Sequence, residues 1–330
     1  MNHALPALTG TLVALLWLPA MGQVPPSPAS AFAEAVKGAK STPGLLTVHE
    51  KADRILLEIP PSALDRDLLL SPTVEGAIGD QNNTAGDYLD IDQMVVRFRR
   101  VGGAVQLLRR NLRYRAAPGS PMEGVIERSF SDSILASAKL ESDPLPEGGS
   151  LLVEAGALFT KDLLNYGAVL EKSYKLPYRV DAGTSAVTAA RPFPANVEIT
   201  ALLNFTIDRL PLPAAGAPPM PPPPIAPPDV RSLVVRLRYS LSTLPGPGFR
   251  PRLADDRIGF FTEDLEDFTD QRTETPYLRL IHRWRLEKAD PTAALSPPLQ
   301  PIVVWIEHTV PQRYRPPIRA GILRWNEAGA

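Results

Sequence analysis

The chain has 330 residues, of which 44% are hydrophobic, and a formal net charge of -1 at pH 7. This hydrophobic share excludes wholesale disorder, and the balanced charge disfavours a dedicated nucleic-acid-binding protein, whose domains are clearly basic. The 37 prolines favour strands joined by stiff loops over long helices. Because the sequence has no cysteine, disulfides, thiolate nucleophiles, cysteine zinc sites and iron–sulfur clusters are excluded.

The N-terminus carries an apolar segment of the kind that directs secretion. The run from Leu12 to Leu18 is followed by the small-residue pattern Ala20-Met21-Gly22. We expect a signal peptide over residues 1–22 and a secreted or periplasmic mature protein. No lysine or arginine precedes the run. An uncleaved anchor is therefore the alternative, and only in that case would the protein bind a membrane.

A short N-terminal domain is expected over residues 31–72. Ala31 to Lys40 have the composition of a short helix, and two apolar bursts around Lys51-Ala52-Asp53 predict a hairpin. Ser62 is expected to cap a helical turn that contains Leu64.

Residues 73–298 are expected to form a β-rich domain. Its clearest hairpin surrounds Val101-Gly102-Gly103, and Met94, Val96 and Phe98 share one face of the first strand.

Two further strands of this domain flank a proline-rich segment. They are "NVEITALLNFTID" and "RSLVVRLRYSLSTLP", and the second alternates strictly between apolar and polar residues. Residues 211–228 between them are expected to form an exposed loop that joins two antiparallel strands. Binding of a polyproline-recognising module is the alternative function of this loop.

The last segment, residues 299–330, is expected to open a new strand–helix unit. "PIVVWIEHTVP" is a continuous apolar run, which predicts a central buried strand over Ile302 to Ile306. The following prolines suit the first turn of a helix. The apolar face of that helix carries Ile318, Ile322 and Trp325. The predicted fold class is therefore α+β and β-rich, with antiparallel sheets, hairpins and few short helices.

The sequence offers no recognised catalytic motif. The histidines His3, His49, His282 and His308 lie far apart, and H-E-x-x-H, Gly-x-Ser-x-Gly and phosphate-binding glycine loops are absent. His282 and His308 are interpreted as structural histidines rather than ligands. No catalytic, cofactor-binding or metal-binding residue is predicted.

Two charged stretches are interpreted as solvated surface. The acidic run from Thr262 to Asp270 lacks the spacing of an EF-hand, so we expect a loop and not a calcium site. The arginines around the hairpin at Gly102 are expected on the solvent face of a sheet, and no nucleic-acid partner is predicted.

The densest stretch of charge and aromatic residues runs from Pro251 to Asp264. Its charged side chains are expected to form buried or half-buried ion pairs that fix a loop. The alternative is a contact with a neighbouring domain. The candidates for that interdomain contact are Arg252, Asp255, Asp256, Arg257 and Trp325.

Three C-terminal motifs together resemble those of a known family. In order and spacing, "RPRLADDRIGFF", "RWRLEKADP" and "PIVVWIEHTVPQRYRPPIRAGILRWNEA" resemble secreted bacterial zinc-dependent metallopeptidases with a metzincin-like catalytic domain. Upstream, "GLLTVHEKADRILLEIPPSALDRDLLL", the hairpin, "LFTKD" and "FPANVEI" resemble the domains of unknown function that precede that catalytic domain. The resemblance covers the chain from about Ala31 to its end.

The resemblance implies a role without catalysis. In such relatives the final strand and helix open the catalytic domain, and the zinc motif H-E-x-x-H-x-x-G-x-x-H follows further downstream, where it activates water for peptide-bond hydrolysis. These 330 residues lack that motif. We therefore expect an N-terminal, non-catalytic region truncated before the zinc motif and inactive alone, with zinc only in the downstream domain.

The resemblance also implies partners. The expected partner is that catalytic domain, missing or separately encoded, and a peptide or protein substrate through it. The alternatives are a standalone envelope or extracellular binding protein and one half of a split peptidase.

Overall fold

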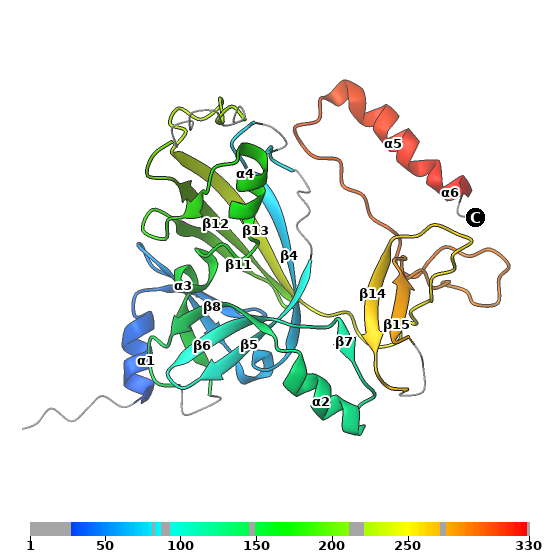
Figure 1. Cartoon of the computed structure of the whole chain (residues 1–330), viewed down its shortest axis with the longest axis horizontal. Helices are drawn as coiled ribbons and strands as arrows, with labels where there is room; N and C mark the ends of the chain where they lie inside the picture. Colours follow the sequence, from blue (N-terminus) through cyan, green and yellow to red (C-terminus); the bar gives the residue numbers. More distant parts are fainter. Residues whose placement is uncertain are drawn as a thin grey trace, which may run out of the picture. The chain divides into compact units, whose positions relative to one another are not determined.

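The computed structural model describes residues 28–80, 83–86, 93–144, 149–210, 221–270 and 275–328. The chain divides into two units, which are described separately (Figure 1). Unit 1 comprises Met1–Leu108 and Ile134–Thr243, and unit 2 comprises Arg109–Ser133 and Leu244–Ala330. The predicted signal peptide and residues 211–220 of the proline-rich segment lie outside the described residues. No helix within the described ranges is long and apolar enough to cross a membrane.

Unit 1 contains three α-helices and a 3-10 turn among its described residues. These are α1 (Pro28–Val36), α3 (Ala155–Phe159), α4 (Tyr166–Tyr174) and the 3-10 turn η1 (Pro61–Ala63). Its strands are β1 (Lys40–Thr42), β2 (Thr47–Glu50), β3 (Ile55–Ile59), β4 (Asp67–Gly76), β5 (Met94–Val101), β6 (Ala104–Arg109), β8 (Ser133–Lys139), β9 (Leu151–Glu154), β10 (Arg179–Val180), β11 (Ala186–Pro192), β12 (Asn196–Thr206) and β13 (Ser232–Thr243).

The strands of unit 1 form two sheets. The larger sheet has eight strands in the order β10-β12-β13-β4-β5-β6-β8, with β11 paired to β12, and the smaller has the order β1-β2-β3-β9. The protein therefore has the predicted α+β, β-rich fold with antiparallel pairs and few short helices.

Three strand predictions are confirmed in these sheets. The hairpin at Gly102 joins β5 to β6, and Gly102 itself adopts φ +57°, which glycine tolerates. The residues of β13 alternate between buried and solvent-facing positions, as predicted. β12 and β13 pair antiparallel from Asn196 opposite Ser242 to Thr206 opposite Ser232, so the proline-rich segment does connect two antiparallel strands.

One hydrophobic core joins the two sheets of unit 1. Leu57 of β3 and Leu237 of β13 belong to the same cluster of buried side chains. Helix α3 adds Phe159, whose ring centroid lies 5.5 Å from that of Tyr239 on β13. Full burial of one such apolar side chain stabilises a fold by about 1.5–3 kcal/mol, so this core carries the stability of unit 1.

Strand β4 crosses the predicted domain boundary between residues 72 and 73. Leu70 before the boundary and Val74 after it are both buried in the core of unit 1. Residues 31–72 therefore share their packing with the following residues. The second predicted boundary, between residues 298 and 299, falls inside unit 2.

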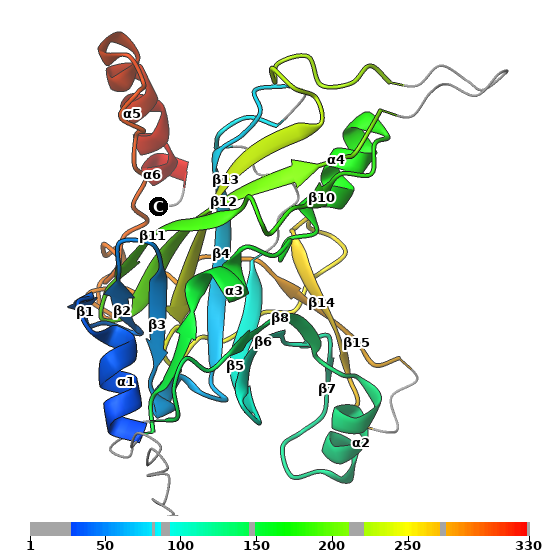
Figure 2. The ribbon, with the colours of Figure 1, turned by 90° about the vertical axis from the view of Figure 1, so that its left-hand side faces the viewer.

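Helix α1 covers the face of the smaller sheet that points away from this core (Figure 2). Phe32 of α1 packs with Leu56 of β3 and Leu152 of β9 in a separate small cluster. Because side chains alternate across a strand, the neighbouring positions on β3 and β9 point into the main core instead.

Unit 2 has a small sheet and three helices among its described residues. Its elements are β7 (Tyr114–Arg115), α2 (Pro121–Ser129), β14 (Thr262–Asp267), β15 (Tyr277–Ile281), the 3-10 turn η2 (Gln312–Tyr314), α5 (Arg315–Leu323) and α6 (Trp325–Ala328). The sheet order is β15-β14-β7, in which β14 pairs antiparallel with β15 and parallel with β7.

The predicted strand over Ile302 to Ile306 is not formed. These residues belong to no sheet, and 64% of Val303 and 89% of Trp305 are exposed. A strand needs a neighbour that accepts its main-chain hydrogen bonds, and no described strand lies beside this segment. The predicted helix after Pro316 is confirmed as α5.

Two local predictions upstream are wrong. The acidic run was expected to be a loop, but Thr262–Asp267 form β14 because β15 and β7 pair with it on both sides. Ser62 does not cap a helix containing Leu64, because η1 ends at Ala63 and Leu64 is extended with ψ 142°.

Candidate functional site: the apolar surface of unit 2

The described part of unit 2 contains no buried side chain. All the buried apolar residues belong to unit 1, whereas large apolar side chains in unit 2 face solvent. We define the apolar surface as the exposed large apolar side chains between Phe249 and Trp325. Its most exposed aromatic members are Phe261, Trp284, Trp305 and Trp325. Contiguous exposed apolar side chains mark binding surfaces in soluble proteins.

Main-chain hydrogen bonds hold the sheet of unit 2 together in place of a core. The Ile281 amide donates to the carbonyl of Arg252 at 3.0 Å, and the Ala254 amide donates to the carbonyl of Arg279 at 2.9 Å. The intervening Leu253 bridges to Leu280 of β15. The segment before β14 therefore extends the sheet beside β15 and keeps its side chains exposed.

Among the predicted contact residues the structure pairs Asp255 with Arg257, and it pairs Asp256 with Arg279, which was not predicted. Arg257 Nη2 lies 2.6 Å from Asp255 Oδ2, and Arg279 Nη1 lies 3.5 Å from Asp256 Oδ1. The side chains of Arg257 and Asp256 are 86% and 95% exposed, so the expected burial of these ion pairs is wrong. The segment that carries Asp255 to Arg257 covers no core, so its charged side chains stay in contact with water.

The Asp255–Arg257 pair shifts the titration of both groups. The side-chain hydrogen bond from Arg257, followed by its main-chain one, lowers the pKa of Asp255. The same side-chain bond to Asp255 raises the pKa of Arg257. Both groups are therefore charged at neutral pH and stay available to an approaching polar partner.

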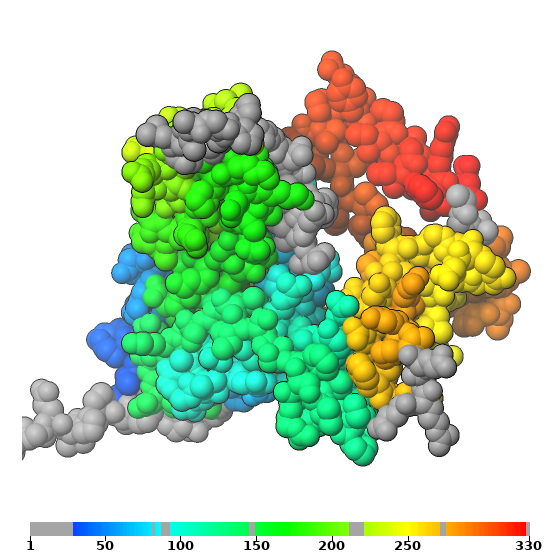
Figure 3. Space-filling view, viewed as in Figure 1, coloured from blue at the N-terminus to red at the C-terminus, as the bar shows by residue number. Residues whose placement is uncertain are grey.

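Trp325 belongs to a second part of the apolar surface, on α5 and α6. It is 77% exposed, and Ile318, about two helical turns earlier, is 38% exposed. The space-filling view shows the red surface of these helices as a rod one helix wide (Figure 3). The apolar face predicted for this helix thus lies open to a partner.

The histidines of unit 2 are exposed and form no metal site. His282 Nε2 lies 3.8 Å from Glu263 Oε2, and His308 Nδ1 lies 2.7 Å from Glu307 Oε1. No group of three His, Asp or Glu side chains suited to a metal occurs among the described residues. His282 and His308, interpreted from the sequence as structural histidines, are thus surface side chains that each contact one glutamate.

No role was predicted for His49 of unit 1, which lies on β2. It is 4% exposed and hydrogen-bonded to both Ser41 and Glu58. Its position opposite Ser41 depends on the register of β1 with β2, for which the sequence holds no short motif.

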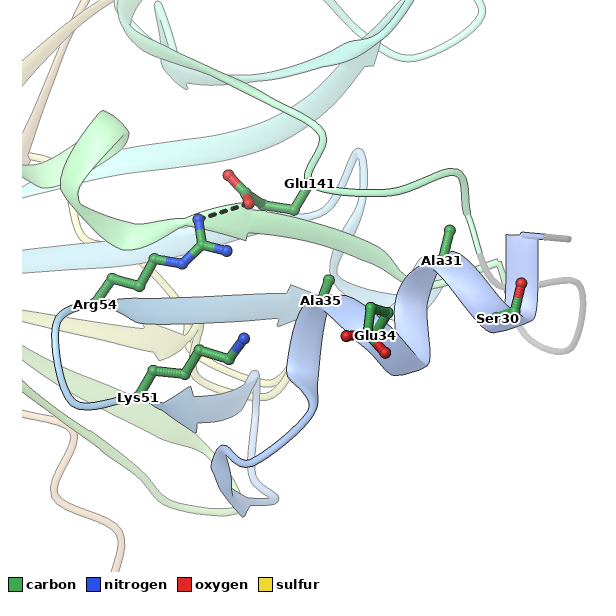
Figure 4. A pocket seen from close by; sticks show the side chains of 7 residues that line it. All are labelled: Ser30, Ala31, Glu34, Ala35, Lys51, Arg54 and Glu141. Atoms are coloured by element: carbon green, nitrogen blue, oxygen red, sulfur yellow. Dashed lines mark hydrogen bonds and ion pairs between the residues drawn. The ribbon is translucent and has the colours of Figure 1, made fainter. Parts of the chain in front are cut away.

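An open hollow of about 560 Å³ lies beside α1 in unit 1. Figure 4 shows Glu34 of α1 facing it, with Arg54 of the β2–β3 turn joined to Glu141. The Arg54 Nη1–Glu141 Oε2 distance is 2.8 Å. The charged residues that line this hollow are of both signs, Lys51 and Arg54 beside Glu34 and Glu141, so it offers no single sign to a ligand.

Comparison with known families assigns the chain to one of them. Residues 89–289, more than half of the sequence, match the model of the family described as "Domain of unknown function (DUF5117)". The chain belongs to the DUF5117 family. Residues 29–77 match a second model, "Domain of unknown function (DUF5118)". Searches of curated proteins and of solved structures found no match.

The DUF5117 match spans both units of the structure. It begins before β5 and ends beyond Arg285, so it takes in the eight-stranded sheet from β5 onward and the sheet of unit 2. The apolar surface as far as Leu286 is therefore part of the region that defines this family, and the surface from Leu295 to Trp325 follows it.

Proposed function

We propose that the chain is the non-catalytic N-terminal region of a secreted zinc-dependent metallopeptidase, with unit 1 as a scaffold and unit 2 as the element that holds the catalytic domain. The observation that carries this proposal is that the described part of unit 2 exposes Phe261, Trp305 and Trp325 and buries no side chain. The motifs that resemble those of such peptidases supply the identity of the partner.

The physical argument rests on the cost of exposed apolar area. Burial of a side chain such as Phe261 or Trp305 against a partner contributes about 1.5–3 kcal/mol. Both side chains are exposed in the described part of unit 2, and its sheet depends on main-chain bonds and partly exposed ion pairs, which stabilise a fold weakly. A catalytic domain docked on the apolar surface would supply the missing core.

The charged residues around the apolar surface would set its specificity. Asp256 and Arg257 are adjacent residues with exposed side chains, and the exposed Ile258 follows them. Charged groups at the rim of an interface fix register and speed association more than they add affinity. The chemistry of peptide-bond hydrolysis, with zinc-activated water, belongs to the docked domain.

Isolation of the native protein tests this proposal. An antibody against unit 1 captures the polypeptide from culture, and its intact mass, zinc content and hydrolysis of casein are measured. We expect a polypeptide or a tight complex larger than the 35.9 kDa of this chain, with one zinc ion and chelator-sensitive hydrolysis. The recombinant 330-residue protein alone should show neither zinc nor hydrolysis.

Two results would overturn parts of the proposal. Stoichiometric zinc and casein hydrolysis by the recombinant chain would refute its non-catalytic role. A native mass no larger than the chain, without a zinc-bearing partner, would favour a standalone binding protein.

A matched pair of variants tests the surface itself. Phe261→Ala should weaken binding of the catalytic domain, whereas Phe193→Ala, an exposed phenylalanine of unit 1, should not. Equal binding by both variants would exclude the apolar surface as the docking site.

A further inference from the structure

Three polar side chains of unit 1 form a hydrogen-bonded chain on the smaller sheet. Ser41 Oγ lies 2.7 Å from His49 Nδ1, and His49 Nε2 lies 3.1 Å from Glu58 Oε2. They come from the adjacent strands β1, β2 and β3. A nucleophile bonded to a base that a third group orients is the arrangement that activates serine in acyl transfer.

The burial of the three groups is graded from the interior to the surface. His49 is 4% exposed, and the Phe32 ring of α1 stands edge-on to it at a centroid distance of 6.2 Å. The side chain of Glu58 is 20% exposed, whereas Ser41 is exposed on β1. The imidazole of His49 is thus shielded from water, whereas Ser41 is exposed to it.

The partners of His49 fix its tautomer. An ionised Glu58 carboxylate only accepts hydrogen bonds, so His49 Nε2 carries the hydrogen. Nδ1 then holds the lone pair and accepts the hydrogen bond of the Ser41 hydroxyl. This direction, from hydroxyl to imidazole to carboxylate, is the one that a general base requires.

The register of the strands places the Ser41 amide on the free edge of the sheet. At the β2–β3 turn the Lys51 amide donates a main-chain hydrogen bond to the carbonyl of Arg54 at 2.9 Å. Because bonded and non-bonded pairs alternate, the main chain of His49 bonds toward β3, and the opposite pair Ser41–His49 is non-bonded. The N–H of Ser41 therefore points away from β2, where no described strand pairs with β1.

We propose that Ser41 is an activated nucleophile for acyl transfer from small carboxylic esters, with His49 as general base and Glu58 as the residue that positions the imidazole. The Ser41 oxygen bonds to the ester carbonyl carbon while its proton passes to His49 Nδ1. The carbonyl electron pair moves onto oxygen, which the outward N–H of Ser41 faces.

The cycle closes with water. Collapse of the intermediate breaks the bond to the leaving alkoxide, which takes the proton from Nδ1 and departs as an alcohol. Water then attacks the acyl carbon, gives its proton to Nδ1, and the proton returns to Ser41 as the acid leaves. The sum is ester plus water to acid plus alcohol.

This site is independent of the proposed peptidase role. It lies on β1 to β3, shares no residue with the apolar surface and needs no metal. A chelator would abolish zinc-dependent casein hydrolysis and leave ester hydrolysis by Ser41 unchanged, so the two proposals fail separately.

The test uses the intact chain with p-nitrophenyl acetate and a fluorophosphonate. Peptide mass spectrometry should find the acetyl or phosphonyl group on Ser41, and Ser41→Ala should abolish nitrophenolate release. His49→Gln should slow the reaction at least about 100-fold. Ser137→Ala is the matched control. Ser137 is an exposed serine on strand β8, and it is hydrogen-bonded to no histidine among the described residues.

Each outcome decides the proposal. Modification of Ser41 no faster than that of Ser137, or an unchanged rate in folded His49→Gln, would overturn it. If circular dichroism shows that His49→Gln unfolds, Glu58→Gln decides instead. A lowered kcat at unchanged KM supports positioning by Glu58, and an unchanged kcat refutes it.

Discussion

Arg115 and Asp267 are joined by an ion pair of 2.8 Å although 152 positions separate them in the chain. The pair lies where β7 runs parallel to β14, and the Glu266 amide donates to the carbonyl of Arg113 at 2.7 Å beside it. The two sequence segments of unit 2 are therefore joined by charge and main-chain bonds.

Asp267→Asn should lower the stability of unit 2 in a pH-dependent way. Hydrogen bonds from Thr269, and then from Arg115, hold the pKa of Asp267 below its ordinary value. A lowered folded-state pKa stabilises the fold above the unfolded value of about 3.9, and this contribution disappears as pH falls through the lowered pKa. Because the pair is partly exposed, we expect a loss below about 1 kcal/mol at neutral pH.

Urea unfolding monitored by tryptophan fluorescence measures this effect, because Trp284, Trp305 and Trp325 all belong to unit 2. Asp264→Asn is the control, since Asp264 lies on the same strand with an exposed carboxylate. A difference between Asp267→Asn and the parent protein that grows in acid would contradict the assignment.

Phe159→Ala and Trp325→Ala should differ sharply in the isolated chain. Phe159 is fully buried against Tyr239, so truncation leaves a cavity that costs about 3–5 kcal/mol. Trp325 is 77% exposed, and its truncation should change the free energy of unfolding by less than about 0.5 kcal/mol. Chemical denaturation followed by circular dichroism compares them. A large loss from Trp325→Ala would mean that α6 packs on the protein.

Gly44→Ala should destabilise unit 1 by about 1–3 kcal/mol, as overpacking does. A Cβ at Gly44 would lie 2.7 Å from the carbonyl oxygen of Phe193 and 2.7 Å from Cβ of Pro192. The neighbouring Leu45 amide bonds to that same carbonyl at 2.7 Å, so the backbone has little freedom to move. Thermal unfolding of Gly44→Ala is compared with that of Gly103→Ala, whose Cβ would meet nothing within 4 Å. Equal midpoints would disprove the close approach.

Tyr178 should ionise later than an exposed tyrosine. Burial, and then the charges of Tyr174 and Asp229, raise the pKa of Tyr178 to about 12. A raised folded-state pKa stabilises the fold fully below the unfolded value of about 10, and this contribution is lost as pH rises through the folded value.

Ultraviolet titration of tyrosinate tests this assignment. Tyr178→Phe should remove a step near pH 12, whereas Tyr277→Phe, which removes a 65% exposed ring, should leave that step unchanged. Loss of the same step in both variants would rule out the burial effect.

Periodicity predicted the long strands β5, β12 and β13 of unit 1 because these strands have one buried face. In β13 the side chains Leu233 to Leu241 at every second position all enter the core, and β5 behaves alike from Met94. A pattern of period two predicts a strand whenever a core exists on one side. The glycines of the turn at Gly102 were a second, local indication of the hairpin between β5 and β6.

The same reasoning failed where no core exists. The apolar run at Val303 favoured a buried strand, but burial depends on a partner, which the run itself does not contain. The acidic β14 was missed because the arginines that offset its charge, Arg113 and Arg115, lie far from it in the chain. The Ser41–His49 contact likewise depends on register.

Strand β4 makes the two regions that match separate families depend on each other for their sheet pairing. It lies inside the range of the DUF5118 match, yet its two neighbours, β13 and β5, lie inside that of DUF5117. A polypeptide beginning at residue 89 would leave both neighbours with unsatisfied hydrogen-bonding edges, which invite aggregation. The two segments must therefore be encoded on one polypeptide, and a gene rearrangement that separates them would yield an insoluble product.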